Sequence, residues 1–274
     1  MRMIRVFARK TKWTPTDDMA FYTKPPLFVR DWKSSELVLV SATFTWDIDK
    51  AYALARDWSL HFDNIQVGGP AFGDPGGEFV PGRFIKEGVT FTSRGCPKRC
   101  PWCLVPGREG KLRELKIQNG NIVQDNNLLA CSRGHIESVF AMLAEQKRGI
   151  KFLGGLDIDY MHPWHVELLK KIKIGKCGLC VACDRAEDMK RLDKAADLLS
   201  DFSIEQKRCY VLVGKDGETQ EQAQVRCVAV FAKGFLPYAQ LYRDEKASSV
   251  RGEWRNFCNF WTKPGLYRKK LINN

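Results

Sequence analysis

Three of the ten cysteines stand close together in the sequence, in a turn-rich loop. Cys96, Cys100 and Cys103 have the spacing C-x3-C-x2-C, and the loop follows an apolar, strand-like run at residues 88–93. Cysteine thiolates are the usual protein ligands of iron–sulfur clusters, so three of them can bind three irons of a [4Fe–4S] cubane. The fourth iron is then open to a ligand from outside the chain. The spacing therefore predicts a cluster site with one open iron.

Two other uses of these cysteines stay open. A structural zinc site needs four ligands, usually as two closely spaced C-x2-C pairs. Cys100 and Cys103 could pair with Cys177 and Cys180, but the pairs are much farther apart than in a zinc ribbon, and Cys96 is left without a role. Disulfide bonds are the third use. The N-terminal residues lack the apolar block of a secretory signal, so nothing indicates an oxidising compartment. The spacing favours the cluster.

The composition is that of a folded, basic chain. Of 274 residues, 44% are hydrophobic and 28% are charged, and the formal net charge is +12. Such a surplus favours an anionic partner, such as nucleic acid or a phosphorylated substrate, although solubility explains it equally well. Part of the positive charge surrounds the cysteine loop, in Arg94, Lys98, Arg99, Arg108, Lys111, Arg113 and Lys116. No apolar stretch approaches the length of a membrane span, so we expect a cytoplasmic protein that does not bind membranes.

The first third of the chain predicts a small α/β domain. A β-branched, apolar run at residues 37–44 predicts a strand, Asp47 is a suitable N-cap for the helix that follows, and residues 64–70 predict a second strand ending at Gly-Gly-Pro. Residues 70–88 are rich in glycine and proline and predict a linker. We therefore expect a βαβ-like N-terminal domain over residues 1–87.

Strand-like and helix-like segments alternate after the cysteine loop. The expected helices lie at residues 134–146, 163–172, 186–202, 219–233 and 253–261, and the expected strands at 150–155, 179–184, 209–214 and 235–242. Such alternation implies a parallel sheet with helices outside it. Roughly five or six strands are too few for an eight-stranded barrel. We expect a partial α/β barrel over residues 88–245, followed by a C-terminal helix and basic tail over residues 246–274.

The cysteine loop resembles the signature of the radical S-adenosylmethionine (SAM) superfamily. In that superfamily the amino and carboxylate groups of SAM occupy the open iron, and an aromatic residue precedes the third cysteine, as Trp102 does here. The resemblance implies two cofactors, a [4Fe–4S] cluster and SAM, with Trp102 beside the SAM site. It also implies a partial (β/α)6-type barrel whose cluster loop follows the first strand, in agreement with the alternation.

The resemblance assigns SAM-binding roles to further residues. Gly154 and Gly155 stand where the family has Gly-Gly-Glu, although two glycines after a strand are otherwise an ordinary turn. The glutamate that meets the SAM amino group is replaced by Leu156, and Asp157 is a candidate substitute.

Two later segments extend this set. The sequence VLVGKDGET at residues 211–219 resembles the strand and glycine-rich turn that line the adenine pocket, which brings in Gly214; the alternative is an ordinary turn with Thr219 as N-cap. Asp184 closes the preceding strand, where it would meet the ribose or carboxylate of SAM, or cap the next helix. No catalytic residue is identified.

The closest branches are the radical SAM enzymes with a cobalamin-type N-terminal domain and the methylthiotransferases. The turn at residues 67–72 resembles the strand end and Gly-Gly-Pro turn of those cobalamin domains. The chain has only part of such a domain and no Asp-x-His-x-x-Gly motif, so cobalamin is not favoured as a cofactor. It also lacks a second three-cysteine domain and an obvious RNA-binding β domain.

Two other clusters have metal-ligating residue types. Cys177, Cys180 and Cys183 form C-x2-C-x2-C and could hold an auxiliary cluster, but alternate strand residues point to opposite faces, which favours buried thiols. The segment at residues 157–165 contains two carboxylates and two histidines; it could bind metal or shuttle a proton, but a polar loop with a helix cap is the favoured interpretation.

The resemblance thus implies an enzyme that cleaves SAM reductively. A donor such as flavodoxin or ferredoxin would supply the electron, and the 5′-deoxyadenosyl radical would abstract hydrogen from a substrate in methyl transfer, methylthio transfer or another radical modification. The substrate is not identified, and the charge favours an anion or nucleic acid. The alternatives are a barrel that keeps the cluster without turnover, suggested by Leu156, and a zinc-containing, basic nucleic-acid-binding protein without catalysis.

Overall fold

The computed structural model describes residues 3–74, 78–242 and 252–272, which form two compact units on either side of Gly120. The first unit comprises residues 1–120 and the second residues 121–274. The domain boundary expected at residue 245 lies outside the described residues, and the one expected at residue 87 stays a prediction. Among the helices that are described, none is long and apolar enough to cross a membrane.

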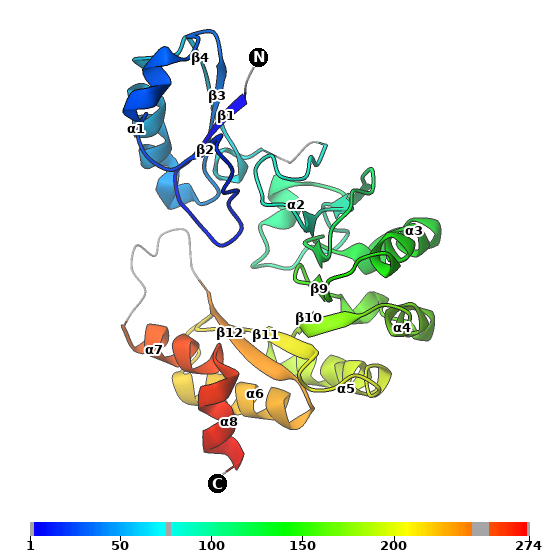
Figure 1. The fold of residues 1–274 in the computed structure, drawn as a ribbon. Coiled ribbons are helices and arrows are strands. Elements are labelled where there is room, and N and C mark those ends of the chain that lie inside the picture. The colour runs from blue at the N-terminus through cyan, green and yellow to red at the C-terminus, as the bar shows by residue number, and fades with distance from the viewer. Residues whose placement is uncertain (1–2, 75–77, 243–251, 273–274) are drawn as a thin grey trace. The chain divides into compact units, whose positions relative to one another are not determined.

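The first unit is built around a four-stranded parallel sheet. Its strands are β1 (Met3–Phe7), β2 (Ala20–Phe21), β3 (Leu37–Ser41) and β4 (Asn64–Gly68), in the order β2-β1-β3-β4. Helix α1 (Ile48–Ser59) connects β3 to β4 and buries Ala51, Leu54 and Trp58 in the core of this unit (Figure 1). The βαβ unit expected from the sequence is therefore present, with two further strands on its β3 side.

Strand β1 was not among the predicted strands, and its sequence contains the basic residue Arg5. Its burial is nonetheless almost complete, and Arg5 is only 8% exposed. The Arg5 guanidinium forms an ion pair with Asp17 and donates to the backbone oxygens of Gly82 and Arg83 at 2.7 and 2.8 Å. These distant partners allow an arginine to be buried in a central strand, since a buried charge must be paired and hydrogen-bonded.

The cysteine loop also belongs to the first unit. The expected strand at residues 88–93 is divided into β5 (Val89–Thr90) and β6 (Ser93–Arg94). Strand β6 pairs antiparallel with β7 (Arg113–Glu114), and the short helix α2 (Val105–Arg108) lies between them in the chain. The β6–β7 pair holds the two ends of the loop together.

The second unit has the predicted α/β architecture. Its parallel strands run in the order β12-β11-β10-β9-β8, and Figure 1 shows α3 to α6 along one side of them. The strands are β8 (Ile122–Val123), β9 (Ile150–Phe152), β10 (Ile174–Ala182), β11 (Lys207–Val213) and β12 (Leu236–Leu241). The helices are α3 (Arg133–Ala144), α4 (Pro163–Lys170), α5 (Met189–Leu198), α6 (Gln220–Ala232), α7 (Gly252–Trp261) and α8 (Pro264–Ile272). Both units also contain short 3-10 turns. Those of the first unit are Leu27–Asp31, Thr45–Asp47 and Pro70–Phe72, and those of the second unit are Leu128–Ala130, Ile158–Tyr160 and Ala186–Asp188.

The faces of this sheet differ in exposure. Along β11, buried and half-buried residues alternate, and Cys209, Val211 and Val213 are fully buried. Helix α6 buries Ala223, Cys227 and Val230. Since side chains alternate between the faces of a strand, the half-buried residues of β11 lie on the opposite face, away from the helices. The carboxyl ends of the strands and this open face are where the second unit can present polar side chains.

Candidate metal centre

The cysteine loop is closed by a tight backbone contact at its base. Gly95 has φ +78°, and a Cβ at this position would overlap the backbone oxygen of Lys111. The Cys96 amide donates to the Gly110 oxygen at 3.4 Å, and the Cys103 amide donates to the Cys100 oxygen at 3.0 Å. A glycine is required at residue 95, because other residues rarely adopt this backbone conformation and their Cβ would not fit. The folding of the loop therefore depends on it.

All three cysteines of the triplet line one cavity of about 710 Å³. Cys96 and Cys100 are half-buried and Cys103 is exposed. The remaining lining residues are Pro97, Arg99, Pro106, Gly107, Gly110, Lys111 and Leu112. No carboxylate is among them, so the donors that face this cavity are three sulfur atoms accompanied by two cationic side chains.

A cluster and a single metal ion place different demands on these three cysteines. Within the part of the chain that the structure describes, no three His, Cys, Asp or Glu side chains converge closely enough to hold one metal ion. In a cubane cluster, however, each thiolate binds a different iron, so the sulfur atoms need not meet at one point. A tetrahedral zinc requires all of its ligands at one point. The three cysteines line the same cavity, as three protein ligands of one cluster must.

Positively charged side chains lie around the loop and line its cavity. Arg94 forms an ion pair with Glu109 at 3.3 Å, and both side chains are largely buried. Glu109 also accepts from the Gly95 amide at 3.3 Å, and the Arg94 guanidinium lies 3.8 Å from the centre of the Phe91 ring. Arg94 thus has a structural partner, whereas Arg99 and Lys111 line the cavity. Cations at such positions can offset the negative charge of a bound anionic group.

Trp102, the aromatic residue of the motif, is half-buried in the same loop. The other residues expected to bind SAM belong to the second unit. Gly154 and Gly155 follow β9, Asp184 follows β10 and Gly214 follows β11. These residues therefore share the carboxyl edge of one parallel sheet, which is where open α/β sheets bind ligands.

The two glycines after β9 are required by the backbone. A Cβ on Gly154 would overlap the backbone oxygen of Asp125, and Gly155 has φ +100°. Leu156 follows them and is only 2% exposed, and its amide donates to the Cys180 oxygen at 2.7 Å. Leu156 is consequently a core residue, and its side chain offers nothing to a ligand.

Asp157 caps the 3-10 turn Ile158–Tyr160. Its carboxylate accepts from the Asp159 amide at 3.1 Å, from Asn127 Nδ2 at 2.9 Å and from Arg191 at 3.4 Å. The guanidinium of Arg191 also binds Asp159 and Asp188, at 2.7 and 2.9 Å. Asp157 therefore belongs to a network of acidic residues around one arginine.

The two histidines of this segment cap α4. The His162 amide donates to His165 Nδ1 at 3.0 Å, and Pro163 occupies the first turn. Burial, together with the neighbouring charge of His162, lowers the pKa of His165 to about 4, so the ring is neutral at physiological pH. These contacts are those of a polar loop with a helix cap.

Asp184 and Gly214 have defined local roles at the edge. Asp184 Oδ1 accepts from the Leu212 amide at 3.3 Å, which ties the end of β10 to β11. Gly214 has φ +75°, and its amide donates to Glu218 Oε2 at 2.9 Å. Thr219 caps α6 in a capping box with Gln222, as the ordinary alternative for this segment requires.

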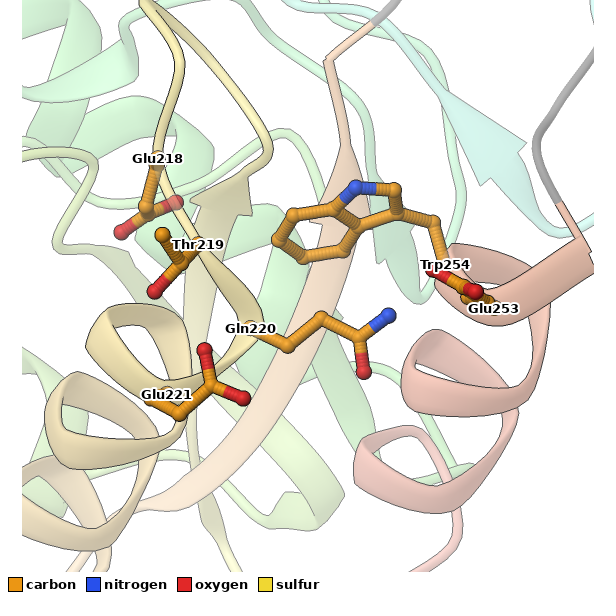
Figure 2. A pocket seen from close by; sticks show the side chains of 6 residues that line it. All are labelled: Glu218, Thr219, Gln220, Glu221, Glu253 and Trp254. Atoms are coloured by element: carbon orange, nitrogen blue, oxygen red, sulfur yellow. The ribbon is translucent and has the colours of Figure 1, made fainter.

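Sequence reasoning missed the cavity beside this turn. It measures about 350 Å³ and is lined by Glu218, Thr219, Gln220, Glu221, Glu253 and Trp254. Figure 2 shows the side chains of the α6 turn on one side and the Trp254 indole on the other. Trp254 comes within 3.3 Å of the Cβ position of Gly214. No short-range signal connects these segments, because they lie far apart in the sequence.

The three cysteines proposed for an auxiliary cluster are all buried. The Cys180 thiol donates to the Cys177 oxygen at 3.5 Å, whereas the Cys183 thiol donates to the Arg185 oxygen at 3.7 Å. Burial raises the pKa of Cys180 to about 11 and that of Cys183 to about 12. Both are therefore neutral thiols at physiological pH, with separate hydrogen-bond acceptors.

Neither a protein-family model nor a curated protein matches this sequence.

Proposed function

We propose that this chain is a radical SAM enzyme. The observation that carries the proposal is that Cys96, Cys100 and Cys103, spaced C-x3-C-x2-C, line one cavity. These residues would hold a [4Fe–4S] cluster by three thiolates and leave one iron open. When bound, the cluster would pass one electron from an external donor to SAM and so supply the reductive cleavage of its S–C5′ bond, and the 5′-deoxyadenosyl radical formed would abstract hydrogen from the substrate.

The chain's own residues bind, orient and shield these groups. Arg99 and Lys111 offset the negative charge of cluster and thiolates. In the second unit, the glycine turns at Gly154 and Gly155 and at Gly214 leave backbone accessible beside the sheet edge, and Asp184 provides a carboxylate for the ribose. Because Leu156 is buried, the SAM amino group needs another acceptor, and the Asp157 carboxylate is the proposed one.

The proposal extends to the architecture and the partners. The parallel sheet of the second unit and its outer helices would form the (β/α)6-type partial barrel of the superfamily. The electron donor would be an acidic one-electron carrier such as flavodoxin or ferredoxin, whose charge complements the basic loop. Cobalamin is not among the proposed cofactors, because no histidine that could be its lower ligand is identified.

The test is a purification of the full chain without oxygen, followed by metal analysis and a SAM-cleavage assay with a strong reductant. We expect a brown protein with about four irons per chain that forms 5′-deoxyadenosine. A colourless protein that carries zinc and binds nucleic acid with a strong dependence on salt would replace this proposal with the binding protein without catalysis. A full cluster that binds SAM without forming 5′-deoxyadenosine would indicate a barrel that has lost turnover.

A further inference from the structure

The open face of the sheet in the second unit carries an unusual set of side chains. Register places Arg208 of β11 beside Cys180 of β10, and Tyr210 of β11 beside Tyr238 of β12. On β9, Phe152 stacks on Phe140 of α3 and so faces the helices. Its neighbour Lys151 therefore lies on the open face, because adjacent residues of a strand point to opposite faces.

Two cations on this face, Lys151 and Arg208, have no acidic partner among the residues that the structure describes. Among the residues that the structure describes, neither Lys151 nor Arg208 forms an ion pair or a side-chain hydrogen bond. Both side chains are half-buried. A partly desolvated charge without a counter-ion is unfavourable, so this arrangement is suited to a ligand that brings negative charge.

The surroundings of Arg208 are aromatic and neutral. Its guanidinium lies 4.7 Å from the centre of the Tyr238 ring, and the Tyr210 and Tyr238 rings are perpendicular with their centres 5.7 Å apart. The Tyr210 hydroxyl donates to the Leu153 backbone oxygen at 3.1 Å, which fixes that ring. A cation–π contact orients the guanidinium without neutralising it, so its N–H groups keep their capacity for an anion.

The side chains of Lys151 and Arg208 can reach the same region of the open face. They lie on the two strands that flank β10. Arg208 pairs with Cys180, and Lys151 precedes Phe152, which pairs with Leu179, so the backbones of Lys151 and Arg208 are roughly 12 Å apart. Burial raises the pKa of Cys180, and the positive charges of Arg208 and Lys151 oppose this rise, so both cations lie near the thiol. Long side chains from these two positions can converge on one anionic group.

We propose that this face binds an oxyanion group of the substrate, a carboxylate or a phosphate, with Arg208 as its main contact and Lys151 as the second cation. The inference rests on the proposed function, because it makes the open face of the same sheet the place of the substrate. It narrows the possible substrates to molecules that carry a carboxylate or a phosphate group. Arg208 suits this role because its planar fork donates two parallel hydrogen bonds to a carboxylate or phosphate.

The test uses small anions, since the substrate is not identified. The melting temperature of the full chain, purified without oxygen, is measured against sodium phosphate and, separately, sodium acetate, with sodium chloride holding the ionic strength constant. We expect at least one anion to raise the melting temperature by about 2–4 °C at 100 mM. A response to phosphate alone indicates a phosphorylated substrate, and an equal response to acetate indicates a carboxylate.

Four variants assign the response to this face. Arg208→Gln and Lys151→Gln are expected to reduce or abolish it, and Arg208→Lys to retain part of it if Arg208→Gln does not fold. Lys171→Gln removes an exposed lysine that forms no ion pair with the described part of the chain. It changes the net charge equally and is expected to respond like the wild type. Equal responses in wild type, Arg208→Gln and Lys151→Gln, or no response beyond chloride in the wild type, would overturn the inference.

The outcome is separable from that of the proposed function. Iron content is measured on the same samples, and Arg208→Gln is expected to retain it, because Arg208 is not among the proposed cluster ligands. Loss of the anion response with the iron content retained supports the inference. A wild-type chain without iron that still responds to phosphate through Arg208 retains the anion site and loses only the proposed chemistry.

Discussion

Arg226 of α6 reaches back to Glu218 in the turn that follows β11, and its Nε donates to Glu218 Oε1 at 2.9 Å. Both side chains are largely buried, with 10% and 15% of their surface exposed. Arg226 also donates to the backbone oxygens of Leu212 and Cys183 at 2.6 and 3.3 Å, and Glu218 accepts from the Gly214 amide. One ion pair therefore holds the glycine turn, the end of β11 and the end of β10 in a fixed arrangement.

Replacing Glu218 is expected to destabilise this edge. Glu218→Ala leaves Arg226 buried without its anion and removes the acceptor of the Gly214 amide, so we expect the free energy of unfolding to fall by about 2–4 kcal/mol. Urea unfolding measures the change. The control is Gln224→Ala, an exposed position on the same helix, for which a change within about 0.5 kcal/mol is expected. Equal stabilities of the two variants would show that the ion pair contributes little.

Removal of one cysteine of the triplet is expected to eliminate the cluster. Cys100→Ala leaves two thiolates for a cluster that needs three from the chain, so iron content and 5′-deoxyadenosine formation should both fall by at least about tenfold. Cys131→Ala, outside the loop, should retain both. Iron analysis and a product assay on protein purified without oxygen give the answer. A full cluster in Cys100→Ala would contradict the ligand assignment.

Two glycine-to-alanine substitutions are expected to change the free energy of unfolding in opposite directions, one through a steric clash and the other through helix propensity. A Cβ at Gly154 would overlap the Asp125 backbone, so Gly154→Ala should lower the free energy of unfolding by at least about 2 kcal/mol. Gly134 lies in α3 with open space around its Cβ position, so Gly134→Ala should raise the free energy of unfolding by up to about 1 kcal/mol. Urea unfolding of both variants should give opposite signs. A neutral Gly154→Ala would mean that the turn after β9 can move.

The lowered pKa of His165 predicts that the free energy of unfolding decreases in mild acid. Its folded-state pKa of about 4 is below the ordinary value of 6.5, so the unfolded chain binds the proton more readily. The stabilisation is complete above pH 6.5 and is lost as the pH falls towards 4, with a limit of about 3 kcal/mol. His165→Asn keeps an acceptor for the His162 amide but does not titrate.

The measurement compares urea unfolding at pH 7.5 and pH 5. Between these values the wild type should lose at least about 1 kcal/mol more than His165→Asn, because other titrating groups contribute equally to both proteins. Parallel losses in the two proteins would show that protonation of His165 has no linkage to folding.

Periodic segments were predicted well, and the reason is local. The expected helix at residues 219–233 is α6, and its start follows from Thr219, whose capping box needs only the next three residues. The expected strand at residues 235–242 is β12. Helix α8 was not predicted, since only a basic tail was expected after the helix at residues 253–261. Pro264 opens α8, at a position where proline is tolerated.

Asp47 shows how a correct boundary can have a different cause. It precedes α1 as expected, but its carboxylate makes no cap bond and instead accepts from Arg9 at 2.7 and 2.8 Å. The partner is 38 residues away, so no local pattern could indicate it.

The sequence by itself determined which side chains can do chemistry, because the spacing of Cys96, Cys100 and Cys103 and the repeated strand–helix pattern are local properties of the chain. Only the tertiary structure decided which of these residues lie together and which are accessible. The three cysteines line one cavity because Gly95 lets the two ends of the loop approach each other. Leu156 is buried, so its side chain is not accessible to a ligand. Arg208 and Lys151 share an open face because parallel strands bring distant residues into register, and contacts of that kind depend on packing across the sheet.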